Sequence, residues 1–129
     1  MIVLCRSMSE ATIHKSIVQY LWLCLPDGSL FHHSPNEGRH HISHRVQQKN
    51  LGMCTGWPDL EVFIAYRFWL SDKPWAPVFL EVKTAKGRVT PSQADVHTNL
   101  TQLGCHVHVV RSIDDAAAAL RGYAELRHA

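Results

Sequence analysis

No stretch of the 129-residue sequence approaches the roughly 20 consecutive apolar residues that a membrane-spanning helix requires. The apolar opening, residues 1–5, is too short for the core of a signal peptide, and no cleavage-like site follows it. Both absences predict a protein that is neither inserted into a membrane nor exported. We therefore expect a cytoplasmic location.

Clustered cysteines are absent as well. The four cysteines are scattered without any C-x-x-C pair: Cys5, Cys24, Cys54 and Cys105. Disulfide frameworks and zinc sites need regularly spaced cysteines, so we expect buried thiols in a reducing cytosol instead. Seven of the ten histidines lie in three short groups, but none combines with cysteines at zinc-finger spacing: His32-His33, His40-His41-x-x-His44 and His106-x-His108. Most of them are expected to be surface or half-buried side chains.

Acidic residues are missing from two windows of the chain, residues 38–58 and 84–94, although the net charge is only +2. The basic residues of these windows are Arg39, Arg45, Lys49, Lys86 and Arg88. One window ends just before Asp59 and the other begins shortly after Glu81. Basic groups beside carboxylates suit an anionic substrate such as nucleic acid, and we name these five residues as candidate nucleic-acid contacts. Two solvated surfaces would give the same pattern.

Hydrophobic periodicity predicts alternating helices and strands in one α/β domain, residues 9–129, behind an N-terminal tail, residues 1–8, for which disorder is expected. The expected elements are a helix capped by Ser9 and ending near Cys24, strand 30–33, a short basic helix within 42–51, strands 60–66 and 78–83, helix 91–103, strand 105–110 and a last helix from 113 to near Arg127. The two strands around the Pro-broken connection 71–77 form a hairpin, and the sheet is mixed.

Three polar residues stand out in the predicted hairpin: Asp59, Glu81 and Lys83. Pairing of the two strands brings Asp59 and Glu81 together, and alternation along the second strand puts Glu81 and Lys83 on the face of Phe79. Phosphodiester hydrolysis needs a metal ion and a positive group beside the developing charge, and Mg²⁺ prefers carboxylate ligands. Because E-x-K and Pro-Asp are common, an exposed strand face remains an alternative at this point.

Several blocks of the sequence together resemble the VRR-NUC domain, a branch of the PD-(D/E)XK nucleases. They are His33-Ser34-Pro35-Asn36-Glu37-Gly38, Gly56-Trp57-Pro58-Asp59-Leu60, Phe79-Leu80-Glu81-Val82-Lys83, Gly87-Arg88-Val89-Thr90-Pro91-Ser92-Gln93, Gly104-Cys105-His106-Val107 and Val110-Arg111-Ser112. The first block is similar to a loop of stand-alone phage and bacterial members. Several matched blocks in order are more specific than any one of them.

The resemblance implies a restriction-endonuclease-like fold, with a mixed sheet flanked by helices, and a Mg²⁺- or Mn²⁺-dependent nuclease. It implies that Asp59 and Glu81 bind the metal, with the Val82 carbonyl as a further ligand. It also implies that Lys83 orients the attacking water and stabilises the transition state.

Two helical residues complete the expected site. Gln93 matches a motif glutamine of the family, which implies a supporting role, although it is equally suited to cap its own helix. Glu10 matches an acidic residue that such nucleases often carry on the first helix as an extra metal ligand. An acid also favours a first helical turn for electrostatic reasons. Glu61 shares a strand face with Asp59 and is a less suitable substitute ligand.

The resemblance further implies a DNA substrate. Stand-alone members are similar to Holliday junction resolvases, which are homodimers, so we expect a structure-selective endonuclease in a bacterial or phage-infected cell. Flap or restriction-type cleavage, or a nuclease fold that only binds DNA, are the alternatives. Two segments are candidate dimer surfaces: the connection 69–77 and the basic helix 41–51.

Overall fold

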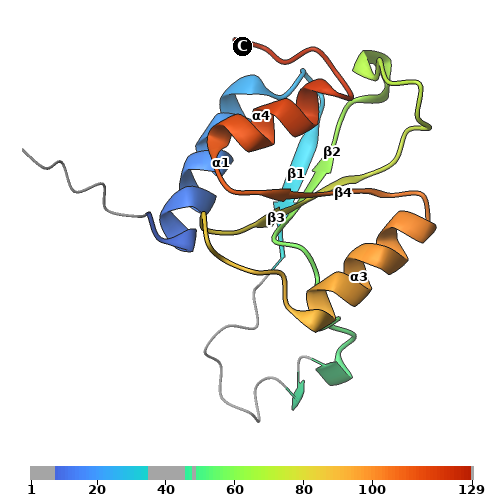
Figure 1. Cartoon of the computed structure of the whole chain (residues 1–129). Helices are drawn as coiled ribbons and strands as arrows, with labels where there is room; N and C mark the ends of the chain where they lie inside the picture. Colours follow the sequence, from blue (N-terminus) through green and yellow to red (C-terminus); the bar gives the residue numbers. More distant parts are fainter. Residues whose placement is uncertain (1–7, 35–45, 48, 129) are drawn as a thin grey trace, which may run out of the picture.

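The computed structural model describes residues 8–34, 46–47 and 49–128, which form a four-stranded sheet with helices on both faces (Figure 1). The elements in chain order are α1 (Glu10–Cys24), β1 (Leu30–His33), β2 (Leu60–Phe63), the 3-10 helix η1 (Tyr66–Phe68), β3 (Val78–Val82), α3 (Pro91–Gln102), β4 (His106–Val110) and α4 (Ile113–Arg121). The strands lie in the order β1-β2-β3-β4, antiparallel except for β4, which runs parallel to β3. The predicted α/β class with a mixed sheet is confirmed.

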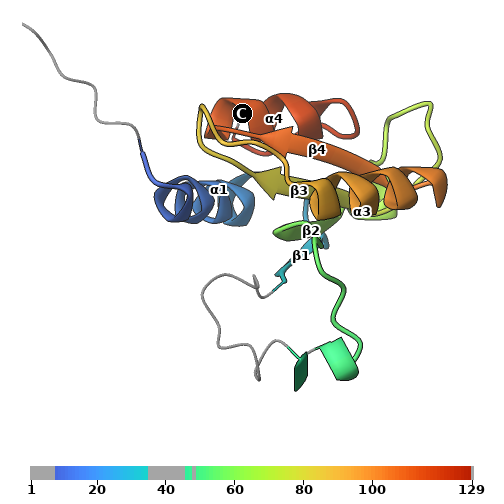
Figure 2. The ribbon, with the colours of Figure 1, turned by 60° about the horizontal axis from the view of Figure 1, so that its bottom comes forward.

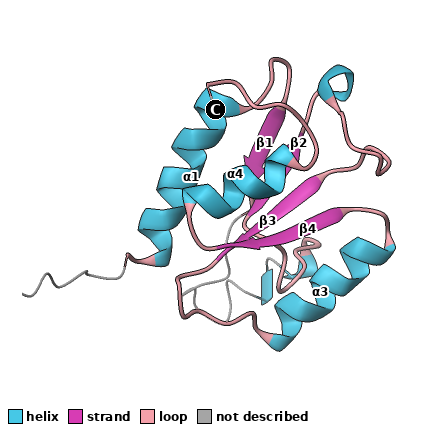
Figure 3. Ribbon diagram, turned by 45° about the horizontal axis from the view of Figure 1, so that its top comes forward, coloured by secondary structure: helices cyan, strands magenta, loops and turns pink. Residues whose placement is uncertain are grey.

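Helices α1 and α4 cover one face of the sheet, and α3 covers the other. In Figure 2 the strand β4 lies between α4 and α3, and Figure 3 shows α1 and α4 side by side. The larger core joins Ile17 and Leu21 of α1 and Leu120 of α4 to one face of the strands. A smaller core joins Phe79 of β3 to the apolar side of α3.

The helix starts follow the predicted capping chemistry. The Ser9 hydroxyl accepts a hydrogen bond from the Thr12 N–H at 3.2 Å, and α1 ends at Cys24 as expected. At α3 the Thr90 hydroxyl accepts from the Gln93 N–H, and Gln93 Oε1 accepts from the Thr90 N–H. This capping box fixes the N-terminal turn of α3 at the edge of the candidate site.

The register explains why β3 is buried on both faces. Leu60 of β2 pairs with Leu80, and Val62 pairs with Val78, so one face of the hairpin belongs to the larger core. The alternate residues of β3 face α3 instead, because side chains alternate along a strand. Glu81 belongs to that second set and is therefore enclosed rather than exposed.

The predicted strand 60–66 is too long. It ends at Phe63, because the chain turns into η1, where the Phe68 N–H donates to the Ala65 carbonyl at 2.9 Å. The Trp75 indole N–H donates to the Ile64 carbonyl at 2.7 Å, which ties the following connection back to the strand end.

The last helix is also shorter than predicted, since it ends at Arg121 with Gly122 as its C-cap. Arg127 does not continue the helix but returns to the end of α1. Its backbone N–H donates to the Cys24 carbonyl at 2.8 Å, and its Nε donates to the Leu25 carbonyl at 2.7 Å.

The expectation of buried thiols is wrong for Cys54, which is exposed. Cys24 is buried and Cys105 is half-buried. Of the predicted basic helix, residues 46–47 and 49–50 are helical, and the part at 42–45 lies outside the described residues. Cys5 and residues 1–7 of the predicted tail also lie outside them. Within the described ranges, no helix is both long and apolar enough to cross a bilayer.

Candidate active site

Asp59, Glu81 and Lys83 are the buried charged side chains of the part of the chain that the structure describes. Their exposed fractions are 5%, 1% and 7%. Asp59 directly precedes β2, Glu81 lies within β3 and Lys83 follows its last residue. Desolvating charged groups is costly unless they compensate one another, so a fold seldom buries three without a use for them. An exposed strand face, the alternative interpretation of Glu81 and Lys83, is wrong.

The two carboxyl groups lie in contact. Asp59 Oδ2 accepts a hydrogen bond from the Val82 N–H at 2.8 Å, and its carboxyl group is hydrogen-bonded to that of Glu81. Burial, together with the adjacent Asp59, raises the pKa of Glu81 to about 9, although the Lys83 ammonium opposes this rise. At neutral pH and without a cation, Glu81 therefore retains its proton.

The Val82 carbonyl faces the same side as Asp59. The Lys83 N–H donates to the Val110 carbonyl of β4 at 3.0 Å, and no described peptide bond is cis. Because C=O and N–H of one trans peptide point in opposite directions, the Val82 carbonyl points away from β4. This is also the direction of the Val82 N–H, which donates to Asp59. Two carboxylates and one carbonyl oxygen thus border one small region.

Glu10, the first residue of α1, reaches the same region. It lines a pocket of about 280 Å³ together with Asp59, His14 and His33. Burial raises the pKa of Glu10, which Asp59 also raises and the Lys83 ammonium lowers. Glu10 is therefore within electrostatic range of two of the buried charges.

A metal ion held by side chains alone is not indicated. Among residues 8–34, 46–47 and 49–128, no group of three His, Cys, Asp or Glu side chains is arranged to hold an ion. Mg²⁺ commonly uses one or two carboxylates and completes its shell with carbonyl oxygens, water and substrate phosphate. The donor set around Asp59 and Glu81 fits an ion of this kind.

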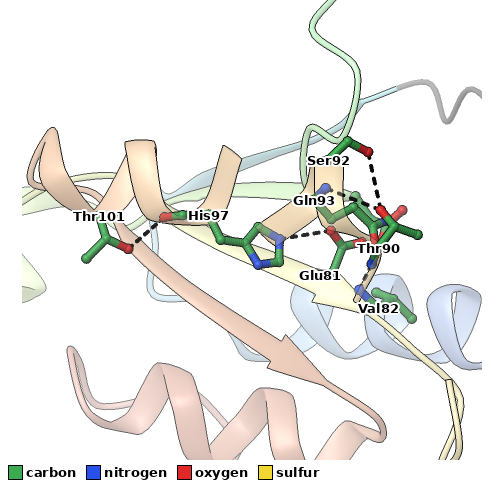
Figure 4. Close-up of polar contacts among 8 residues, drawn as sticks. Glu81, Val82, Thr90, Ser92, Gln93, His97 and Thr101 are labelled. Atoms are coloured by element: carbon green, nitrogen blue, oxygen red, sulfur yellow. Dashed lines mark hydrogen bonds and ion pairs between the residues drawn. The ribbon is translucent and has the colours of Figure 1, made fainter. Parts of the chain in front are cut away.

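His97 is a site residue that the sequence did not reveal. Its Nε2 lies 3.0 Å from Oε1 of Glu81 (Figure 4). Burial lowers the pKa of His97, and the nearby Lys83 lowers it further. The available signal was its spacing of four residues from Gln93, which places both on one side of α3.

The backbone at Asp59 is held from two directions. Its carbonyl accepts from the Ser34 N–H at 3.0 Å, and Nδ1 of His33 lies 3.1 Å from it. On the other side, Gly56 has a φ of +88°, and a Cβ there would lie 2.6 Å from the carbonyl carbon of Ser92 at the start of α3. The Gly-Trp-Pro-Asp and Thr-Pro-x-Gln blocks are thus in direct contact.

Glu61 contacts the two segments that precede β2 in the chain, through Trp57 and Ser34. Its Oε1 accepts from the Trp57 indole N–H at 2.6 Å and from the Ser34 hydroxyl at 3.1 Å. These contacts engage one carboxylate oxygen of Glu61 with residues 34 and 57.

Of the predicted nucleic-acid contacts, Lys49, Lys86 and Arg88 are exposed, whereas Arg39 and Arg45 lie outside the described residues. Lys86 belongs to a turn that Arg111 holds. The Arg111 guanidinium donates to the Thr84 carbonyl at 2.6 Å and to the Gly87 carbonyl at 2.7 Å. The turn begins one residue after Lys83, so the backbone that carries Lys86 is held close in the chain to the buried site.

Comparisons with known proteins give the family and the fold of the chain. The family model of the VRR-NUC domain matches residues 7–114. A solved structure described as a VRR_NUC domain protein is similar with a TM-score of 0.71 and 19% identity, over 92% of this chain and 89% of that one. No curated protein matches. At this identity the structural similarity establishes a shared fold.

Proposed function

The chain belongs to the VRR-NUC family of nuclease domains, as its motifs indicated, and from this premise we propose that it is a metal-dependent DNA endonuclease. Asp59, Glu81 and Lys83 form its catalytic centre. The observation that carries the proposal is the burial of these three charged side chains at adjoining strand ends, with the two carboxyl groups in contact. A fold that only binds DNA would have no need of such an arrangement.

Asp59 and Glu81 would hold a divalent cation, Mg²⁺ or Mn²⁺, with the Val82 carbonyl as a third ligand. Support comes from the direction of that carbonyl and from the proton that Glu81 retains in the absence of a cation. When bound, such an ion neutralises the phosphate and lowers the pKa of an attacking water. Glu10 would be an additional ligand, because it lines the same pocket as Asp59.

Lys83 acts on the reacting phosphate. The residue is only 7% exposed, so its ammonium group has little freedom to move away from the site. A fixed cation in a partly water-excluded site stabilises developing negative charge more than a mobile surface lysine does. Lys83 would also orient the attacking water.

The exposed basic side chains draw the DNA toward this acidic centre. Lys86 and Arg88 follow the site directly in the chain, and the Arg111 contacts fix the turn that carries Lys86. These residues, with Lys49, Arg39 and Arg45, would contact phosphates and would not read base sequence.

We further propose that the substrate is a branched DNA, such as a four-way junction, and that the enzyme is a homodimer. A symmetric junction offers two equivalent strands, and a two-fold dimer supplies two sites. The proposal rests on the family resemblance. Flap cleavage remains the second candidate.

Labelled junction, flap, duplex and single-stranded DNA should be incubated with the protein in Mg²⁺, Mn²⁺ or EDTA. Strand cleavage in either metal and none in EDTA is expected, with the junction cut fastest. Light scattering of the same samples gives the oligomeric state. Tight binding of all four DNAs without cleavage in any metal would identify a DNA-binding module instead, and a monomer that cuts junction and duplex equally would remove the resolvase proposal alone.

A further inference from the structure

We infer that His97 is a positioning residue: its imidazole holds the carboxylate of Glu81 in the orientation that binds the metal ion. The inference rests on the proposed function, because it assigns a support to one of the proposed ligands. The carrying observation is the direct contact of 3.0 Å between His97 Nε2 and Glu81 Oε1.

The contact lies inside the fold, where it cannot easily be replaced by water. The side chain of His97 is 15% exposed, and that of Glu81 is 1% exposed. Elsewhere α3 meets the sheet through apolar side chains, with Val96 and Leu100 against Phe79. A buried polar contact beside an apolar interface restricts the geometry of both partners, because breaking it leaves a buried polar atom with one partner fewer.

Gln93 is engaged elsewhere, which leaves this task to His97. The Gln93 side-chain oxygen accepts the Thr90 N–H at 2.9 Å in the capping box. Figure 4 shows the Gln93 and Thr90 groups together at the start of α3, while His97 projects one turn later toward Glu81. The helix therefore supports the metal site one turn beyond the motif glutamine.

Holding Oε1 has a defined consequence for the carboxylate. Glu81 has rotatable side-chain bonds, and a hydrogen bond to one oxygen restricts the orientation of the other. With Nε2 of His97 protonated, its N–H can donate to Oε1 over the 3.0 Å contact, which leaves the second oxygen for a cation beside Asp59. Hydrogen bonds of this kind to metal-binding carboxylates typically change metal affinity or activity by about 10–100-fold when they are removed.

The test uses His97→Leu, which keeps the volume but removes the donor, and His97→Gln, whose amide nitrogen can reach Glu81. Thr98→Leu, an exposed position on the same helix, is the matched control. The dissociation constant of Mn²⁺ is measured by calorimetry without DNA, and kcat and KM are measured for the preferred DNA. We expect His97→Leu to weaken Mn²⁺ binding by about 10–100-fold, with KM for DNA unchanged and kcat restored by excess metal. His97→Gln and Thr98→Leu should bind Mn²⁺ like the wild type.

The outcomes distinguish the role of His97 from the proposed function. If the wild type binds Mn²⁺ and cuts DNA, and His97→Leu does both equally well, the role of His97 is overturned and the proposed function stands. If His97→Gln loses as much affinity as His97→Leu, the hydrogen bond is not what matters and the role is overturned again. A wild type that binds no Mn²⁺ overturns the proposed function together with this role.

A second measurement tests whether His97 acts through Glu81. In a Glu81→Gln background, His97→Leu should not weaken Mn²⁺ binding further, because the group it supports has changed. An additional loss of the same size would show that His97 acts elsewhere. His97→Asn, which is too short to reach Glu81, replaces His97→Leu if that variant does not fold.

Discussion

The carboxyl groups of Asp59 and Glu81 are hydrogen-bonded to each other inside the fold, although one precedes β2 and the other lies in β3. The antiparallel register that pairs Leu60 with Leu80 creates this proximity, because each acid is the neighbour of a paired leucine. Two enclosed acids in contact cannot both ionise cheaply without a cation. The pair is therefore stable with a shared proton or with a bound metal ion.

Stability of the metal-free protein should depend on pH through Glu81. Its pKa rises from an ordinary value of 4.5 to about 9 in the folded state, so the folded state holds the proton more tightly than the unfolded chain. This contribution to stability is complete below pH 4.5 and is lost as the pH rises through 9. Urea denaturation in EDTA between about pH 6 and pH 9 should show declining stability in the wild type and a flatter profile in Glu81→Gln. Equal slopes would refute the shared proton.

Lys83→Met should separate catalysis from metal binding. The variant keeps the approximate length of the side chain but removes the positive charge that we propose stabilises the transition state. Loss of such a stabilising group typically lowers kcat by about 10²–10³-fold. Mn²⁺ affinity, measured by calorimetry, should not fall. A Lys83→Met enzyme with normal kcat would mean that the buried lysine only compensates the acids.

Salt should weaken DNA binding steeply, since the proposed contacts are to phosphates. The triple variant Arg39→Ala, Arg45→Ala, Lys49→Ala and the double variant Lys86→Ala, Arg88→Ala should each reduce the slope of log K against log salt by about one unit for every phosphate group that the protein no longer neutralises. Arg121→Ala, on α4 across the sheet from α3, is the control. If only the control changes the slope, the DNA lies on the other face.

Arg111 should matter for DNA binding and not for metal binding. Arg111→Met removes the donors to the Thr84 and Gly87 carbonyls and leaves the turn that carries Lys86 without its anchor. We expect weaker binding of DNA at unchanged Mn²⁺ affinity, measured by fluorescence anisotropy and calorimetry. Normal DNA binding by the folded variant would argue against an ordered turn as part of the interface.

Gly56→Ala should disturb both the fold and the site. A Cβ at Gly56 would meet the backbone of Ser92, at 2.6 Å from its carbonyl carbon, and the residue also has a positive φ. Gly104 has a φ of +94°, and a Cβ added there would have nothing within 4 Å. Gly104→Ala therefore measures only the cost of placing alanine at a positive φ. That cost is expected to be about 1 kcal/mol. Gly56→Ala should lose clearly more in chemical denaturation, and equal losses would contradict the close approach of the two backbones.

Much of this structure could be predicted from local patterns. Caps at Ser9 and Thr90, the strand pairing and the Asp59–Glu81 proximity follow from rules that act over a few residues or one hairpin. Gly122 was a local signal for the end of α4. The return of Arg127 to the end of α1 had no such signal, because it binds the carbonyls of Cys24 and Leu25 far away in the chain. The contact of His97 with Glu81 depends likewise on how α3 packs over β3, which no spacing within the helix determines.

The most direct test is single-turnover cleavage of labelled DNA in Mn²⁺ by Asp59→Asn and Glu81→Gln, with Glu125→Gln as an exposed control. Each of the two site variants loses a proposed metal ligand while its shape is kept. Removal of a supporting group is expected to slow cleavage by about 10–100-fold, and the rate of each site variant should fall by more than this. Circular dichroism should show that both variants are folded, and the control should cleave at the normal rate. Cleavage at the wild-type rate by either folded variant would contradict the assignment of this pair as the catalytic metal site.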